Sequence, residues 1–182
     1  MAKRMFLWAY NRKPFKWTPA QSAHWFANTD LSNWLGGVAG MPQGGAGNWA
    51  LSCVEFPLYC AVYDSSLTVN EANTIYGRLV VTGWTSPEPL LRRGPWSYIP
   101  WLKIRGFGRW APSYGDLVFF SMAGHPLAHV VTSIGGDRVV SFGEGPPPGV
   151  LGYRNVTPRI MTIQEVLAIY VGASVTYGEP IW

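Results

Sequence analysis

Residues 115–122, Gly-Asp-Leu-Val-Phe-Phe-Ser-Met, and residues 128–134, Ala-His-Val-Val-Thr-Ser-Ile, decide how this chain is organised. Both are short apolar runs rich in β-branched and aromatic residues, a composition that favours buried strands. A third run, Arg138–Phe142, follows the second after Gly135-Gly136-Asp137, which is typical of a hairpin turn. We therefore expect four strands, over residues 116–122, 128–134, 138–142 and 153–161.

Three helix starts carry the same signal, a hydroxyl residue followed three positions later by glutamate. In such a capping box the hydroxyl and the carboxylate bind backbone N–H groups that the first helical turn leaves without partners. The three boxes are Ser52–Glu55, Thr68–Glu71 and Thr162–Glu165. They predict helices over residues 53–64, 69–82 and 163–171.

These elements predict an α+β fold, with N-terminal helices packed on a small antiparallel sheet. The chain has 182 residues, of which 48% are hydrophobic and 13% charged, and this favours a single globular domain over 1–182. Within it, residues 1–47 form an aromatic extension in which only 20–35 is predicted to be helical. Residues 48–182 form the core, interrupted by a Pro-, Gly- and Trp-rich excursion over 83–112 without a steady period.

The net charge of +4 and the pI near 9.2 favour contact with an anionic polymer. Basic residues and tryptophans alternate between residues 92 and 110, which predicts either a solvated loop or one wall of a substrate groove. No apolar run has the length of a signal peptide core or a membrane span. We therefore expect a soluble protein, made in the cytoplasm without a cleaved leader, with no stable membrane insertion and no nucleic-acid partner. The two cysteines and three histidines match no usual zinc pattern, so we expect neither metal nor cofactor.

One cysteine stands where a nucleophile would be expected. Cys53 follows the first residue of a capping box, and the free N–H groups at a helix start favour the thiolate. His129 opens a predicted strand, whereas His125 falls in a predicted loop and His24 in the N-terminal helix. Imidazole is the side chain best suited to act as a general base near neutral pH. The pattern alone leaves two interpretations open, a Cys53–His129 catalytic pair and a buried structural cysteine.

Three segments together resemble the NlpC/P60 superfamily of papain-like cysteine hydrolases. These are Asn48 to Tyr59, the Gly-Asp-Leu-Val-Phe-Phe run over 115–120, and the stretch His129 to Ser141. The similarity spans residues 48–144 and implies a papain-like fold in which Cys53 is the nucleophile and His129 the base.

The chain departs from the family pattern on both sides of this pair. Ser52-Cys53-Val54-Glu55 replaces the usual Asp-Cys-Ser-Gly and is closer to variants found in bacterial toxin-like members. The third catalytic position falls at Ser141, while Glu144 is similar in position to the acid of the related CHAP domains. Ser141 and Glu144 are therefore both candidates for the third catalytic residue.

The resemblance implies acyl transfer on an amide or peptide bond, most directly in the stem peptides of peptidoglycan. The backbone N–H of Cys53, with Asn48 and Trp49, is expected to bind the oxyanion and the substrate. A toxin-like member would be an antibacterial effector, secreted into a target cell or its periplasm and inhibited by a cognate immunity protein. Two alternatives remain: a papain-like deamidase, transglutaminase or acyltransferase acting on protein or lipid, and a non-catalytic glycan-binding module in which ten tryptophans form the working surface.

Overall fold

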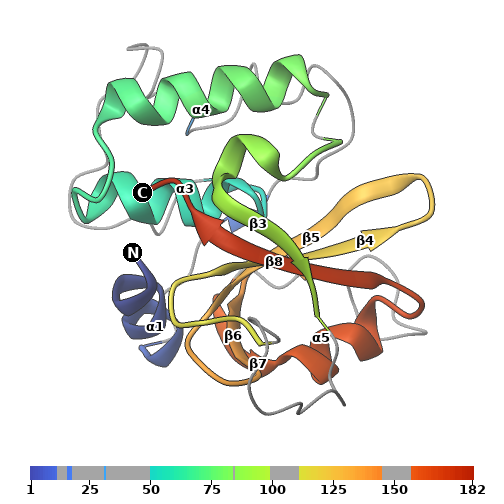
Figure 1. Ribbon diagram of the computed structural model, residues 1–182. Helices are drawn as coiled ribbons and strands as arrows, with labels where there is room; N and C mark the ends of the chain where they lie inside the picture. Colours follow the sequence, from blue (N-terminus) through green and yellow to red (C-terminus); the bar gives the residue numbers. More distant parts are fainter. Residues whose placement is uncertain (12–15, 18–30, 32–49, 84, 99–110, 145–156) are drawn as a thin grey trace.

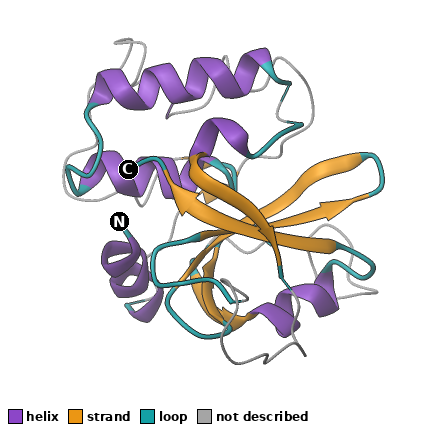
Figure 2. Ribbon diagram, in the orientation of Figure 1, coloured by secondary structure: helices purple, strands orange, loops and turns teal. Residues whose placement is uncertain are grey.

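The computed structural model describes residues 1–11, 16–17, 31, 50–83, 85–98, 111–144 and 157–182, and all that follows concerns these residues. Within them, four α-helices and a six-stranded antiparallel sheet give a mixed α and β structure, in agreement with the expected α+β class (Figures 1 and 2). None of the helices in this part of the chain is both long and apolar enough to cross a bilayer.

The sheet has the strand order β3-β8-β4-β5-β6-β7, and every neighbouring pair is antiparallel. Its strands are β3 Leu91–Ser97, β4 Leu117–Met122, β5 His125–Ser133, β6 Arg138–Ser141, β7 Arg159–Thr162 and β8 Ser174–Pro180. A short parallel pair is formed by β1 Lys16–Trp17 and β2 Ala50–Leu51. The strands predicted over 116–122, 128–134 and 138–142 are confirmed as β4, β5 and β6. Of the strand expected over 153–161, the described part is β7.

The helices are α1 Ala2–Tyr10, α3 Glu55–Tyr63, α4 Val69–Val81 and α5 Ile163–Ile169, with a 3₁₀ turn, η2, over Glu88–Leu90. The three helices predicted from capping boxes are confirmed as α3, α4 and α5. In each box the glutamate backbone N–H donates to the hydroxyl, and the carboxylate accepts from the backbone N–H of the hydroxyl residue.

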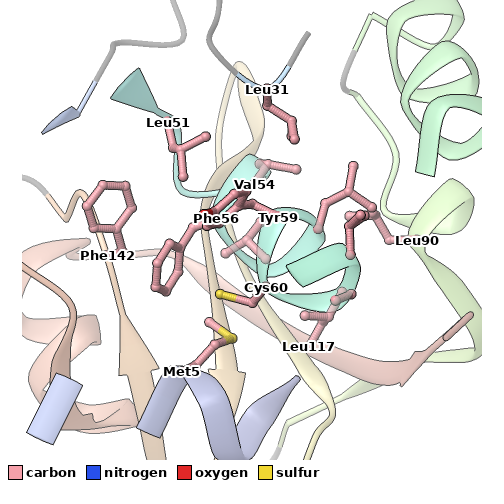
Figure 3. Packing of buried hydrophobic residues seen from close by; sticks show 14 of the residues in the cluster. Met5, Leu31, Leu51, Val54, Phe56, Tyr59, Cys60, Leu90, Leu117 and Phe142 are labelled. Atoms are coloured by element: carbon pink, nitrogen blue, oxygen red, sulfur yellow. The ribbon is translucent and has the colours of Figure 1, made fainter. Parts of the chain in front are cut away.

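The two faces of the sheet bury different sets of side chains, because successive residues of a strand point to opposite sides. Leu117 and Phe119 of β4 join a large cluster with residues of α1, α3 and α4 (Figure 3). Val118 and Phe120 join a second cluster with residues of α5. The apolar run Leu-Val-Phe-Phe is thus buried on both sides, and the sheet lies between helices.

Several expectations require correction. Residues 2–10 were expected to be irregular but form α1, which starts without a side-chain cap and so gives no sequence signal. The segment 83–112, expected to have no steady period, contains η2 and the edge strand β3. Gly and Pro within β3 obscure the strand pattern in the sequence. The exposed residues of β3 include Arg92 and Arg93. The strand β8 was not expected at all. The predicted helix over 20–35 lies outside the described residues except for Leu31, which is helical.

Candidate active site

Cys53 lies in the turn that leads into α3, two residues before the helix begins at Glu55. The Phe56 N–H donates to the Ser52 carbonyl oxygen over 3.1 Å, so the first hydrogen bond of helical spacing encloses Cys53. Cys53 is half-buried and packs against the large core cluster. The sequence placed this thiol in the helix from residue 53, whereas the helix begins at Glu55 and the thiol lies just before it.

The capping carboxylate next to Cys53 is fully buried. Glu55 Oε2 accepts from the Ser52 backbone N–H over 2.8 Å, and Glu55 Oε1 accepts from the Tyr76 hydroxyl of α4 over 3.1 Å. Glu55 has 0% of its surface exposed. These bonds tie the segment that carries Cys53 to a neighbouring helix.

The second cysteine is a core residue. Cys60 is fully buried in α3, and burial raises the pKa of its thiol well above the ordinary value. Cys53 and Cys60 are both free thiols. Because a protonated, inaccessible thiol is a poor nucleophile, Cys60 is unsuited to catalysis.

His129 lies within β5 and does not open it. A two-residue turn, Ala123-Gly124, joins β4 to β5, so the strand already begins at His125. This corrects the assignment of His125 to a loop. The His129 side chain is fully buried, and its ring stacks on Tyr170, with centroids 5.0 Å apart and an interplanar angle of 16°. Packing of this kind holds the imidazole in one orientation.

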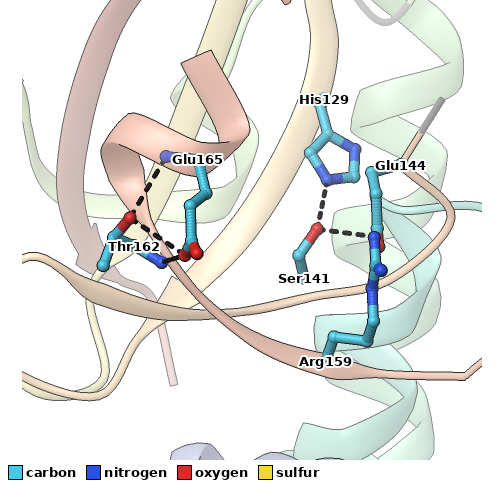
Figure 4. A network of polar contacts seen from close by, with 6 residues as sticks. All are labelled: His129, Ser141, Glu144, Arg159, Thr162 and Glu165. Atoms are coloured by element: carbon cyan, nitrogen blue, oxygen red, sulfur yellow. Dashed lines mark hydrogen bonds and ion pairs between the residues drawn. The ribbon is translucent and has the colours of Figure 1, made fainter. Parts of the chain in front are cut away.

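A chain of polar contacts leads away from the imidazole (Figure 4). His129 Nε2 lies 2.8 Å from Ser141 Oγ. The Ser141 hydroxyl donates to Glu144 Oε2 over 2.9 Å. On the other side of the carboxylate, Arg159 donates to Glu144 Oε1 from Nε over 2.7 Å and forms an ion pair with it through Nη2 at 2.5 Å. His129, Ser141 and Glu144 are each 0% exposed.

The structure thus brings three of the predicted site residues into one connected network. Ser141 contacts the ring directly, and Glu144 accepts the hydrogen bond from Ser141. Arg159 was not predicted as a site residue. Its position follows from the register of β6 and β7, which places it directly opposite Ser141. Asn48, Trp49 and His24 lie outside the described residues.

The two halves of the predicted catalytic pair come from different layers. Cys53 packs against the cluster between α3 and the sheet, while His129 packs on Tyr170, which belongs to the cluster on the other face. Phe56 in the first turn of α3 packs on Phe142 within the cluster that Cys53 contacts, with ring centroids 4.8 Å apart. Phe142 directly follows Ser141. The approach of the Cys53 thiol to the imidazole at this point stays a prediction.

Comparison of the chain with protein-family models, with curated proteins and with solved structures gives no significant match. In the part of the chain that the structure describes, no three His, Cys, Asp or Glu side chains are grouped so that they could hold a metal ion.

Proposed function

We propose that this protein is a papain-like cysteine hydrolase in which Cys53 is the nucleophile and His129 the general base. The observation that carries the proposal is the buried chain from His129 through Ser141 to Glu144. Burying an imidazole, a hydroxyl and a carboxylate together is costly unless each is satisfied by its neighbours. An imidazole that is oriented by a further polar group is the arrangement found beside activated nucleophiles.

The position of Cys53 supports the same proposal from the other side. A thiol in the turn that leads into a helix lies near N–H groups whose partial charge stabilises an anion. In this proposal the backbone N–H of Cys53 donates to the developing oxyanion. Asn48 and Trp49 keep the substrate-binding roles that the family resemblance suggests.

The reaction is acyl transfer to water. The Cys53 thiolate adds to the amide carbonyl carbon, and protonated His129 then gives its proton to the leaving nitrogen as the carbon–nitrogen bond breaks. Water next attacks the thioester while His129 takes one of its protons, which releases the acid and regenerates the thiolate.

We propose peptidoglycan stem peptides as the substrate, because of the NlpC/P60 resemblance and because a net charge of +4 suits an anionic polymer. On the same resemblance, the protein would be an antibacterial effector, with an immunity protein as its partner. The large exposed apolar residues of the described segments do not include tryptophan, so these segments lend no support to the glycan-binding module.

The test is digestion of purified peptidoglycan followed by mass analysis of the soluble muropeptides. We expect new fragments with the wild-type chain and none with Cys53→Ala or His129→Ala. His125→Ala is the matched control, because His125 is an exposed histidine on the same strand and should be dispensable. Fragments that persist in Cys53→Ala would refute the proposal.

A different result would identify the alternative chemistry. If the wild-type chain releases no fragments but an alkylating probe labels Cys53 in a His129-dependent manner, the deamidase, transglutaminase or acyltransferase alternative replaces the wall hydrolase. If labelling is the same in His129→Ala, the catalytic pair itself is wrong.

A further inference from the structure

We infer that Arg159, Glu144 and Ser141 form a positioning relay that holds His129 as the tautomer protonated at Nε2, so that Nδ1 is the ring nitrogen that can accept a proton as the base. The catalytic consequence rests on the proposed function, but the tautomer does not depend on it. None of the three residues is required to touch substrate.

The direction of each hydrogen bond follows from the charge at the end of the chain. The Arg159 guanidinium is always protonated and has donors only. Its Nε and Nη2 atoms both approach Glu144 Oε1. A carboxylate paired in this way with a guanidinium has only acceptors to offer.

The Ser141 hydroxyl has a single proton, and this proton decides the tautomer. Because Glu144 Oε2 can only accept, the proton of Ser141 points toward Glu144. The lone pairs of Ser141 Oγ then face His129 Nε2, 2.8 Å away, and a lone pair requires a donor opposite it. Nε2 must therefore carry the hydrogen in the neutral ring, which leaves the lone pair on Nδ1.

Strand pairing explains how the relay is built. Ser141 and Arg159 face each other across β6 and β7, so their side chains lie on the same side of the sheet. Glu144 follows Ser141 by three residues and is fully buried between them, whereas the Arg159 side chain is 46% exposed. A basic residue at the exposed start of β7 thus pairs with a fully buried carboxylate, whose burial without a partner would be costly.

The relay also shows why serine can stand where a stronger imidazole partner is usual. A lone serine could either donate to or accept from the ring and would fix neither tautomer. Glu144 removes this freedom, because it takes the only hydroxyl proton. The serine then acts as an acceptor whose oxygen is polarised by a charged group.

The experiment is long-range ¹H–¹⁵N NMR correlation of the histidine rings in the full-length ¹⁵N-labelled chain, at a pH where His129 is neutral. The other two histidines are assigned with His24→Gln and His125→Gln. We expect the wild-type His129 ring to be protonated at Nε2. In Glu144→Gln the new amide can donate to Ser141, whose proton can then turn toward His129, so the Nδ1-protonated form should appear.

Further variants separate the relay from a purely structural role. Arg159→Lys should keep the wild-type tautomer, because the charge is retained, whereas Arg159→Gln should give a mixture. Glu165→Gln is the matched control: it makes the same substitution in an exposed capping glutamate and should leave the ring unchanged. Alkylation of Cys53 should slow by roughly tenfold in Glu144→Gln, which is less than the roughly 10²–10⁴-fold contribution of a positioned base because His129 itself is retained.

An Nδ1-protonated ring in the wild type would overturn the inference. A tautomer that stays unchanged in both Ser141→Ala and Arg159→Gln would also overturn it. These two variants provide the test if Glu144→Gln does not fold. Wall hydrolysis dependent on Cys53 together with such a result would refute the relay and leave the proposed function standing. If the tautomers are as expected but no Cys53-dependent reaction is found, the relay stands and the proposed function is refuted.

Discussion

Replacing Glu55 with alanine should destabilise the protein far more than replacing Glu71 or Glu165, although the three glutamates have the same place in their capping boxes. Glu55 is fully buried, whereas Glu71 and Glu165 are exposed. The buried carboxylate accepts hydrogen bonds from the Ser52 backbone N–H and from the Tyr76 hydroxyl. The exposed carboxylates bind only the threonine of their own box in the contacts that the structure resolves for them.

The magnitude follows from these contacts. A hydrogen bond to a charged group contributes about 1.5–3 kcal/mol, so two of them give roughly 3–6 kcal/mol for Glu55→Ala. Glu71→Ala and Glu165→Ala should cost much less, because their carboxylates are exposed and water can replace the bonds that they lose. Small proteins are stable by only about 5–15 kcal/mol, so the Glu55 variant should lose a large share of its stability.

The assay is urea denaturation followed by tryptophan fluorescence, with the free energy of unfolding compared at equal m-value. Tyr76→Phe removes one of the two bonds and should give an intermediate loss. Glu55→Gln preserves the shape of the box and provides a folded reference if the alanine variant is too unstable. A Glu55→Ala loss within about 1 kcal/mol of the Glu71→Ala loss would refute the reasoning, because burial would then add nothing to the cap.

Three further outcomes are expected. Iodoacetamide should label Cys53 in the folded chain and spare Cys60, since burial closes access to Cys60 and raises its pKa; equal labelling by peptide mass analysis would contradict this. The exposed capping carboxylates of α4 and α5 have pKa values below the ordinary 4.5, chiefly because threonine backbone N–H groups donate to them. The stability that these carboxylates contribute is therefore fully present above pH 4.5 and is lost as pH falls through their lower folded-state pKa values. The free energy of unfolding, measured by denaturation at a series of pH values, should decrease in this range, and a constant value would contradict the prediction. Gly178→Ala should cost about 1–3 kcal/mol by thermal denaturation, because its Cβ would lie 2.6 Å from a backbone oxygen of β3, while Gly77→Ala on α4, with open space around it, should stabilise by up to about 1 kcal/mol.

Elements with strong local signals were the ones that the sequence predicted correctly. A capping box involves residues only three positions apart, so the starts of α3, α4 and α5 could be identified without knowledge of the tertiary structure. The run Leu117–Phe120 is apolar throughout because both faces of β4 are covered, which makes it distinct from an amphipathic helix.

Elements whose stability comes from distant partners were missed. The strand β8 contains glycine and ends in proline, yet it lies between β3 and β4, where pairing on both sides compensates for its composition. Gly94 and Pro95 interrupt β3, which an edge strand tolerates because its outer side needs no hydrogen-bond donors. For α1, packing of Met5 and Trp8 into the core replaces the missing cap.

The same distinction between local signals and distant partners applies to the residues of the candidate site. His129 could be singled out from the sequence pattern, and Ser141 and Glu144 from the family resemblance, but the choice between these two as the ring's partner depended on geometry. Arg159 could not be named, because its role exists only through the register between β6 and β7. Pair register across a sheet is a tertiary property, and a shift by one residue would turn Arg159 to the other face.

The end of β6 links the relay to the helix that carries the thiol. Ser141 points to the face that holds His129, and the next residue, Phe142, belongs to the core cluster of the opposite face, where it packs on Phe56. Phe56 follows Cys53 by three residues, which is about one helical turn. The position of the thiol and the orientation of the imidazole therefore depend on two adjacent residues of one strand end, and a change at Phe142 should alter the reactivity of Cys53 while leaving the hydrogen bonds of the relay in place.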